Sequence, residues 1–340
     1  MMKPAVITYC ITKSIVLSRR CVNHCGYCDF HTQAHAPLPS PKKLDQAIRA
    51  ALQQGATELE VLGGEGVGTL KEIASASRYY GFSNYLHYLE QAFAMSAHSN
   101  GRPGLLAVPN LGSFSQGDLE RLKNWVPCLK LFFESSDPAL MMDLAHEGAP
   151  GKAPEKRLQN IIDAGAARIP VTTGILIGIG ETAPSRKRTL AVLAEVHRRY
   201  GHLQNVILEP FEPQAGTKMA DWPACPDELL LETIALARQI FGPEFPLTLR
   251  IFKRQHLLDQ ALESGINDFG EICLGTSIEE NATLLQRLAL IQSYCSARGI
   301  ELQERLPVFA AYQNEEWLSP SLLQLVRQWQ YPANEAAVSM

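Results

Sequence analysis

The sequence contains no long apolar run and no excess of charge of one sign. No stretch of its 340 residues approaches the roughly 20 apolar residues that a membrane-spanning helix needs. Residues 1–10 hold one lysine and no apolar core of signal-peptide length. The formal net charge of −4 gives no electrostatic footprint for nucleic acid or for an anionic membrane. We therefore expect a cytoplasmic protein that binds neither nucleic acid nor membrane.

Cysteine is also scarce, with eight in the whole chain. A disulfide framework is not expected in a chain without a secretory segment. Three cysteines share one short Cys-x-x-x-Cys-x-x-Cys loop, namely Cys21, Cys25 and Cys28. The remaining ones are scattered, as is typical of buried small apolar residues; they are Cys10, Cys128, Cys225, Cys273 and Cys295.

The cysteine loop predicts a metal centre. Three thiolates on one loop can hold three irons of a 4Fe-4S cube, whereas an electron-transfer cluster normally has four cysteine ligands. The fourth iron then stays open for a substrate or cosubstrate, as in other catalytic metal sites. The alternative is a zinc site, whose fourth protein ligand would be His24, His31, His35 or a distant cysteine.

The rest of the chain alternates short apolar runs with longer amphipathic stretches. Hydrophobic residues make up 46% of the sequence and charged residues 19%, as in a well-cored globular protein. Helices are predicted after Ser40 up to Gly55, after Ser115, from Pro154 to Gly165, and over 184–200, 226–241 and 278–297. Eight strands are predicted, at Ser14–Leu17, Glu58–Leu62, Leu105–Val108, Leu129–Phe133, Val171–Ile177, Asn205–Leu208, Leu247–Ile251 and Glu271–Leu274.

This alternation predicts an α/β fold, a single-domain (β/α)8 TIM-type barrel. Residues 1–275 would form the barrel core, and helices in 276–340 would close or cap it. The tail from Pro320 to Met340 has few periodic signals and would pack as a short helix or fray.

Polar or glycine residues follow the predicted strands, where TIM barrels collect their reactive groups. Glycines let the chain approach a ligand closely, so Gly64 and Glu65 can meet a ligand ammonium. Glu134 can accept from ribose hydroxyls, and Arg157 can pair bidentately with a carboxylate. The alternatives are that Gly64 simply forms a turn, that Glu134 is a solvated carboxylate, and that Arg157 forms a surface ion pair.

Three further groups lie near the predicted centre. The Tyr27 ring, between two cysteines, can pack against an adenine. Asp29 and His31 would tune the charge of the cluster. Gly178 follows the fifth strand, and we count it with the cofactor-binding residues. The sequence around it has no phosphate-loop spacing and no lysine, so a nucleotide-triphosphate site is not expected.

The cysteine spacing, with an aromatic residue before the last cysteine, resembles the radical S-adenosylmethionine (SAM) superfamily. Residues 169–182 and 200–208 are similar to the CofG-type subunit 1 of FO synthase (7,8-didemethyl-8-hydroxy-5-deazariboflavin synthase). The similarity extends over roughly residues 5 to 270, and its further phrases are Thr8-Tyr9, Gly81-Phe82-Ser83, Glu134-Ser135-Ser136, residues 146–157 (His146, Pro150, Lys152, Pro154 and Arg157), Pro213 with Gly216-Thr217, and Gly265-Ile266-Asn267-Asp268.

The resemblance implies a radical SAM lyase or synthase. In that superfamily the open iron chelates SAM, and one electron cleaves SAM to a 5′-deoxyadenosyl radical. The FO synthase family condenses tyrosine with a ribitylamino-uracil, and its CofG-type half abstracts hydrogen from the adduct and closes the deazaflavin ring with loss of ammonia. A CofH-type subunit and a low-potential electron donor would be partners. By resemblance, Cys21, Cys25 and Cys28 bind the cluster, and SAM is contacted by Gly64, Glu65, Glu134 and Arg157.

Several phrases differ from those usual in the family. The family's Pro-His-x-Asn is replaced here by Ala107-Val108-Pro109-Asn110, and its Ser-Met-Gly is replaced by Cys128-Leu129-Lys130. Its Gly-Gly-x-Ser-Pro is replaced by Gly-Glu-Ile-Cys-Leu at residues 270–274. The proline that usually follows the Gly63-Gly64-Glu65 position is also missing. One alternative is therefore a divergent paralogue that acts on another small aromatic or amino-acid-derived metabolite. A second alternative is a non-catalytic Fe-S or zinc-binding protein.

Overall fold

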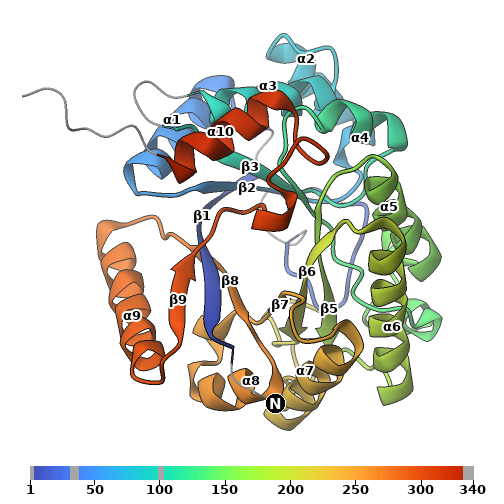
Figure 1. The fold of residues 1–340 in the computed structure, drawn as a ribbon. Helices are drawn as coiled ribbons and strands as arrows, with labels where there is room; N and C mark the ends of the chain where they lie inside the picture. Colours follow the sequence, from blue (N-terminus) through green and yellow to red (C-terminus); the bar gives the residue numbers. More distant parts are fainter. Residues whose placement is uncertain (1–3, 31–37, 99–102, 332–340) are drawn as a thin grey trace, which may run out of the picture.

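Eight parallel strands surround the centre of the molecule in the computed structural model, which describes residues 4–30, 38–98 and 103–331 (Figure 1). The strand order is β3-β2-β1-β8-β7-β6-β5-β4, so the hydrogen-bonded path begins and ends at neighbouring β3 and β4 of a nearly closed barrel. The strands are β1 (Val6–Ser18), β2 (Glu58–Gly63), β3 (Leu106–Asn110), β4 (Leu129–Lys130), β5 (Val171–Ile177), β6 (Leu203–Pro210), β7 (Leu247–Thr248) and β8 (Asp268–Cys273). The predicted single-domain barrel is confirmed.

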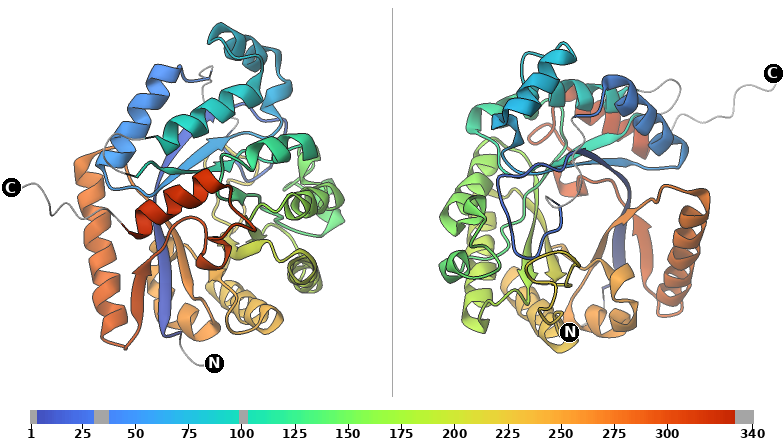
Figure 2. Two further views of the ribbon diagram at one scale, coloured as in Figure 1. Left: turned by 45° about the horizontal axis from the view of Figure 1, so that its top comes forward. Right: turned by 180° about the vertical axis from the view of Figure 1, so that it is seen from behind.

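Helices cover the outside of this barrel (Figure 2). Their ends follow local chemistry: the Ser40 hydroxyl accepts from the Lys43 N–H, Ser115 and Asp118 form a capping box, and Gly201 ends α6 with a positive φ. The helices are α1 (Pro41–Gln53), α2 (Lys71–Tyr79), α3 (Tyr85–Ala97), α4 (Gln116–Leu122), α5 (Pro154–Ala166), α6 (Ala183–Tyr200), α7 (Asp227–Phe241), α8 (Leu258–Ser264), α9 (Ile278–Ser296) and α10 (Pro320–Gln330). Within the described residues, every helix is too short or too polar to cross a bilayer.

Several strand boundaries differ from the prediction. β1 begins eight residues early, at Val6 instead of Ser14, because its first half pairs with β8 and with an unpredicted strand, β9 (Glu301–Glu304). β8 begins at Asp268 instead of Glu271, while β4 and β7 keep only two residues of ladder each. β7 stops early because the chain turns into a 3-10 helix at Ile251.

The segment after β9 covers the amino-terminal end of the barrel. Leu106 at the start of β3 packs with Val308, Trp317 and Val326 in a small separate core. The Tyr312 hydroxyl donates to the Gly201 and Leu203 carbonyls, both at 2.9 Å. Because this end is filled, the opposite end of the barrel, at the carboxyl ends of the strands, is where a site can open. Residues 332–340, in the tail predicted to be helical or frayed, lie outside the described residues.

Candidate functional site

The three cysteines of the predicted metal loop open onto one cavity. β1 runs directly into this loop, and Cys21, Cys25 and Cys28 all line a cavity of about 230 Å³ at the mouth of the barrel. The backbone N–H groups of Asn23 and Glu65 point at the Cys21 sulfur, at 3.4 and 3.3 Å. Such N–H···S hydrogen bonds stabilise a cluster thiolate and tune its potential.

Histidine does not complete a zinc site in the described part of this loop. His24 is exposed and is not among the residues that line the cavity. His31 and His35 lie outside the described residues. Burial raises the pKa of the Cys25 thiol to about 12 despite the nearby Lys152 ammonium, so ionisation at neutral pH requires a bound cation.

Glycines let the cysteine loop lie directly against the end of β2. A β-carbon on Gly64 would lie 1.8 Å from the Arg20 carbonyl oxygen and 2.6 Å from the Cys21 β-carbon. A β-carbon on Gly26 would lie 2.1 Å from the Leu144 carbonyl oxygen. Backbone atoms therefore contact the loop closely at two places, Gly64 and Gly26, and any side chain at either glycine would displace the loop.

Glu65 is held by three partners at the wall of the cavity. Its carboxylate accepts from Asn23 Nδ2 at 2.7 Å, from a terminal nitrogen of Arg157 at 2.7 Å and from the Ser113 hydroxyl at 2.6 Å. Burial opposes its ionisation, but the Arg157 charge and these hydrogen bonds lower the pKa of Glu65 below its usual value. Its charge is thus fixed and its orientation is set.

Arg157 provides the test of whether an anionic cofactor group fits here. Its side chain is almost fully buried, it lines the cavity, and its Nε has no hydrogen-bond partner among the described residues. A buried N–H without an acceptor costs about 1–3 kcal/mol, which a bound carboxylate would recover. The residues present therefore fit a cofactor that carries a carboxylate.

Glu134 also lines the cavity, four residues beyond the end of β4, where it forms an isolated parallel bridge with Ile175 in a left-handed backbone conformation with φ +66°. Its carboxylate accepts from the Tyr27 hydroxyl at 2.5 Å and from the Lys152 ammonium, and it lies 3.2 Å from His146 Nε2. Burial alone would raise the pKa of Glu134, but the Lys152 charge and the His146 hydrogen bond outweigh it and hold the pKa far below its usual range. The Tyr27 side chain, which belongs to the cysteine loop, is thereby held to Glu134 by its hydroxyl.

Gly178 lies apart from this group. It is not among the residues that line the cavity; its N–H donates to the Glu181 carboxylate and its carbonyl accepts from Trp222 Nε1 at 3.2 Å. Its positive φ of +93° forms the turn after β5. A direct role for Gly178 in cofactor binding thus remains a prediction without a contact to support it.

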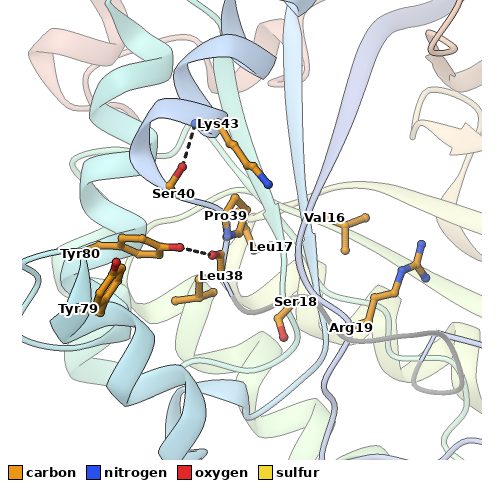
Figure 3. Close-up of a pocket in the computed structure, with 10 residues that line it drawn as sticks. All are labelled: Val16, Leu17, Ser18, Arg19, Leu38, Pro39, Ser40, Lys43, Tyr79 and Tyr80. Atoms are coloured by element: carbon orange, nitrogen blue, oxygen red, sulfur yellow. Dashed lines mark hydrogen bonds between the residues drawn. The ribbon is translucent and has the colours of Figure 1, made fainter.

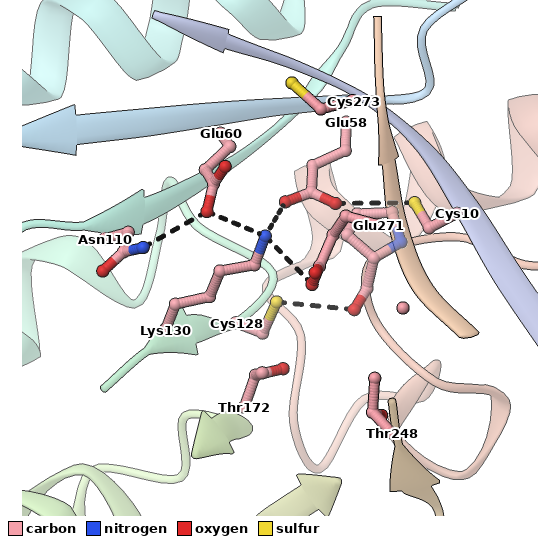
Figure 4. A network of polar contacts seen from close by, with 12 residues as sticks. Cys10, Glu58, Glu60, Asn110, Cys128, Lys130, Thr172, Thr248, Glu271 and Cys273 are labelled. Carbon is pink, nitrogen blue, oxygen red and sulfur yellow. Dashed lines mark hydrogen bonds and ion pairs between the residues drawn. The ribbon is translucent and has the colours of Figure 1, made fainter. Parts of the chain in front are cut away.

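Below the cofactor residues, the barrel interior is closed by a buried ionic network (Figure 4). Lys130 Nζ donates to Glu58 at 2.7 Å and to Glu60 at 3.1 Å, and it forms an ion pair with Glu271 at 3.0 Å. Lys130 and Asn110 also line the cavity, so the top of this network is the cavity floor. Lys130 and Glu271 lie in two segments that differ from the family phrases, and here they contact each other.

A larger hollow, of about 560 Å³, lies beside the first turn of α1 and the end of β1 (Figure 3). Its lining includes Arg19, Lys43 and Tyr79, and Tyr80 donates from its hydroxyl to the Leu38 carbonyl at 3.1 Å. It contains none of the predicted cofactor residues, so size alone does not identify the site.

The structure brings together the three cysteines, Tyr27, Gly64, Glu65, Glu134 and Arg157. Sequence reasoning assigned no role to the groups that hold them, which are Asn23, Ser113, His146 and Lys152. A signal existed for two of these, because His146 and Lys152 stand in the same family-like phrase as Arg157. Asn23 and Ser113 are ordinary loop residues, and only the folded contacts identify them.

Comparison with known proteins places the chain in a family. The model of the radical SAM superfamily matches residues 15–193. A 7,8-didemethyl-8-hydroxy-5-deazariboflavin synthase of Methanosarcina barkeri is 33% identical over 327 residues, covering 95% of this chain and 97% of that protein. The synthase of Trichodesmium erythraeum is 30% identical over 327 residues with the same coverage.

Solved structures share the fold. The FeFe-hydrogenase maturase HydG from Carboxydothermus hydrogenoformans matches with a TM-score of 0.66 at 18% identity, covering 96% of this chain and 71% of that one. Methylornithine synthase (PylB) matches with a TM-score of 0.65 at 17% identity, covering 90% and 86%. Because the deazariboflavin synthases match over 95% of the chain, the alternative of a non-catalytic metal-binding protein is set aside. The chain belongs to the radical SAM superfamily and, within it, to the 7,8-didemethyl-8-hydroxy-5-deazariboflavin synthase family, as an enzyme that uses a 4Fe-4S cluster and SAM.

Proposed function

We propose that this enzyme forms the deazaflavin chromophore. It would abstract hydrogen from an adduct of tyrosine and a ribitylamino-uracil and close the third ring with loss of ammonia. The observation that carries this proposal is the similarity to the deazariboflavin synthases over 95% of the chain. The cavity supports this proposal, because the three cysteines and the charged side chains of Glu65, Glu134 and Arg157 line the same space.

Cys21, Cys25 and Cys28 are proposed to ligate the cluster. Bound together, the cluster and SAM supply a 5′-deoxyadenosyl radical, which is the hydrogen-abstracting species. The unpartnered Nε of Arg157 would donate to the carboxylate of SAM, and Gly64 with Glu65 would meet its ammonium. Asn23 and Ser113 keep the Glu65 carboxylate in one orientation while this cofactor binds.

Tyr27 and Glu134 are proposed to form the opposite wall of the SAM site. Glu134 already accepts from Tyr27 and Lys152, so ribose hydroxyls would share or replace these partners. The Tyr27 ring would pack against the adenine. Lys152 keeps Glu134 ionised, so the wall remains a hydrogen-bond acceptor across the physiological pH range.

The proposed reaction also needs partners. A CofH-type subunit would supply the tyrosine-derived adduct, and a low-potential electron donor would reduce the cluster in the cytoplasm. We further propose that residues 1–275 form the catalytic barrel, with residues 276–340 serving as its cap.

The test is anaerobic reconstitution followed by a coupled assay. The reconstituted protein is given SAM, reductant, a CofH-type subunit, tyrosine and the ribitylamino-uracil, and deazaflavin fluorescence is recorded together with 5′-deoxyadenosine. Cys28→Ala should abolish both signals, whereas Cys295→Ala, a buried cysteine on α9, should keep them. A wild-type protein that cleaves SAM but yields no deazaflavin would contradict the substrate assignment.

One observation favours a second candidate, a paralogue with a different small aromatic or amino-acid-derived substrate. The Lys130–Glu271 contact joins two segments that depart from the family phrases, and it fills the barrel directly below the cavity. SAM cleavage stimulated by another such metabolite, in the same assay without deazaflavin, would support this candidate.

A further inference from the structure

The cavity floor contains a lysine whose ammonium is directed at carboxylates. Lys130 donates to Glu58 at 2.7 Å and to Glu60 at 3.1 Å, and it forms an ion pair with Glu271 at 3.0 Å. Lys130 therefore fills the floor and neutralises the charge of these carboxylates.

Glu60 then determines how Asn110 is oriented. A carboxylate can only accept hydrogen bonds, so the amide must turn its NH2 group toward it. Asn110 Nδ2 donates to Glu60 Oε1 at 3.2 Å, and Figure 4 shows the amide oxygen turned away from Glu60. The other Glu60 oxygen accepts from the Ser14 hydroxyl at 2.8 Å, which fixes the carboxylate in turn. Asn110 lines the cavity, and its Oδ1 is the amide atom to which no donor of the described residues is hydrogen-bonded.

The charges of the network leave no cation for an anionic ligand group. Lys130 is surrounded by three carboxylates, and Arg250 pairs with Glu209 at 2.7 Å and with Glu271 at 3.3 Å. Burial raises the pKa of Glu58 to about 7 against the pull of Lys130, and repulsion by Glu271 and Glu60 adds to this rise. A carboxylate or phosphate at the floor would add charge of the same sign.

We infer that Asn110 is a specificity-determining residue that accepts a hydrogen bond from an N–H or O–H group of the substrate, with Glu60 as the positioning residue that holds its amide. This inference rests on the proposed function for the identity of the ligand, an aromatic precursor, and Phe132 in the same lining offers that precursor an apolar surface. The floor discriminates against a ligand whose deepest group can only accept.

A pair of probes tests this inference without turnover. 4-Methylphenol carries an O–H donor, and 4-methylanisole carries a methyl group in its place. Binding of each to the cluster- and SAM-loaded protein is measured by calorimetry. One neutral hydrogen bond corresponds to a preference of about fivefold for the phenol. Equal affinities for the two probes, or no binding of either, would overturn the inference.

Variants assign the preference to the amide orientation. The Glu60 oxygen that accepts from Asn110 also accepts from Lys130, at 3.1 Å, so in Glu60→Gln the amide oxygen stays toward the ammonium and the preference for the phenol should be retained. Glu60→Met removes that acceptor and leaves the Asn110 amide free to turn over, so the preference should disappear. Asn110→Leu removes the amide itself, and a preference that survives this change would overturn the inference.

Two controls separate the alternatives. Glu58→Gln removes a carboxylate from the same lysine without touching Asn110, so its preference should match that of the wild type. SAM affinity is measured in parallel, and a loss of SAM binding in Asn110→Leu would assign Asn110 to the SAM site and overturn the inference. A protein that prefers the phenol but makes no deazaflavin would retain the inference and refute the proposed function.

Discussion

The position of the cysteine loop depends on the absence of a β-carbon at Gly64. Gly64 lies so close to Arg20 and Cys21 that even a methyl group has no room, at 1.8 and 2.6 Å from backbone and β-carbon. Neither contact is with the flexible end of a side chain, so the loop itself would have to move. The position of the three sulfurs therefore depends on the missing β-carbon of a residue that ligates nothing.

We expect Gly64→Ala to lose most of its bound iron and to show at least tenfold less SAM cleavage, because displacing the loop separates the sulfurs. Iron and sulfide per chain, with the cluster absorbance, measure the effect. Gly117→Ala is the matched control, since a β-carbon there meets nothing within 4 Å and the residue lies in helix α4. The control should keep its cluster and gain about 0.5–1 kcal/mol of stability. Equal iron content in the two variants would contradict this account.

At the level of residues, the sequence identified the groups that line the cavity better than the groups that hold them. The cysteines and Glu65 carry their chemistry in their type and spacing, so they were identifiable. Lys130 was not recognised, because its partners Glu58, Glu60 and Glu271 come from distant strands. A lysine within an apolar run gives no sign of which carboxylates it will meet until the barrel closes.

Among the helices and strands, too, those specified by their own sequence were predicted, whereas those that depend on contacts with distant segments were not. Strands β2 and β5 were predicted within one residue, because each is a short run rich in Leu, Val or Ile and most of its residues are buried. β9, of sequence Glu-Leu-Gln-Glu, has no such run and forms only because β1 offers it a free edge. Helices α2, α3 and α8 were not predicted as elements, although α3 begins with an Asn84 cap that is visible in the sequence.

The contact between α5 and β6 contains a buried histidine that makes stability depend on pH. His202 donates from Nε2 to the Ile161 carbonyl at 2.9 Å, and its buried Nδ1 has no partner among the described residues. Burial lowers the pKa of His202 from 6.5 to about 4. Because unfolded His202 binds a proton at a higher pH than folded His202, stability is full above pH 6.5 and is lost as the pH falls toward 4.

Wild-type protein should therefore lose about 2 kcal/mol more free energy of unfolding than His202→Gln between pH 7.5 and pH 5. Urea denaturation at the two pH values gives the four free energies, and groups common to both proteins cancel in the difference. His202→Gln is expected to be less stable at pH 7.5, since it repacks against Gly165. Parallel pH dependences in the two proteins would show that His202 is not the titrating group.

On the scale of the whole molecule, Lys130 connects strands that are far apart in the barrel wall. Its ammonium joins β4 to β2 and to β8 through carboxylates that are almost fully buried. The three carboxylates repel one another, and the lysine is the cation that they share. Removing it leaves buried charge without a partner, which costs far more than the pair contributes when it is intact.

Lys130→Met should therefore lower the free energy of unfolding by about 3–5 kcal/mol. Within the described part of the chain, Glu60 has its ion pair with Lys130 alone, so adding Glu60→Gln to Lys130→Met removes an abandoned charge. The double variant should therefore recover part of that loss although it has lost a second native residue. Arg198→Ala breaks an exposed ion pair with Glu195 and should change stability by less than about 1 kcal/mol. Denaturation midpoints of the three variants decide the matter: if the double variant is less stable than Lys130→Met, the carboxylates do not repel across the barrel, and the network is held by packing instead of by its shared cation.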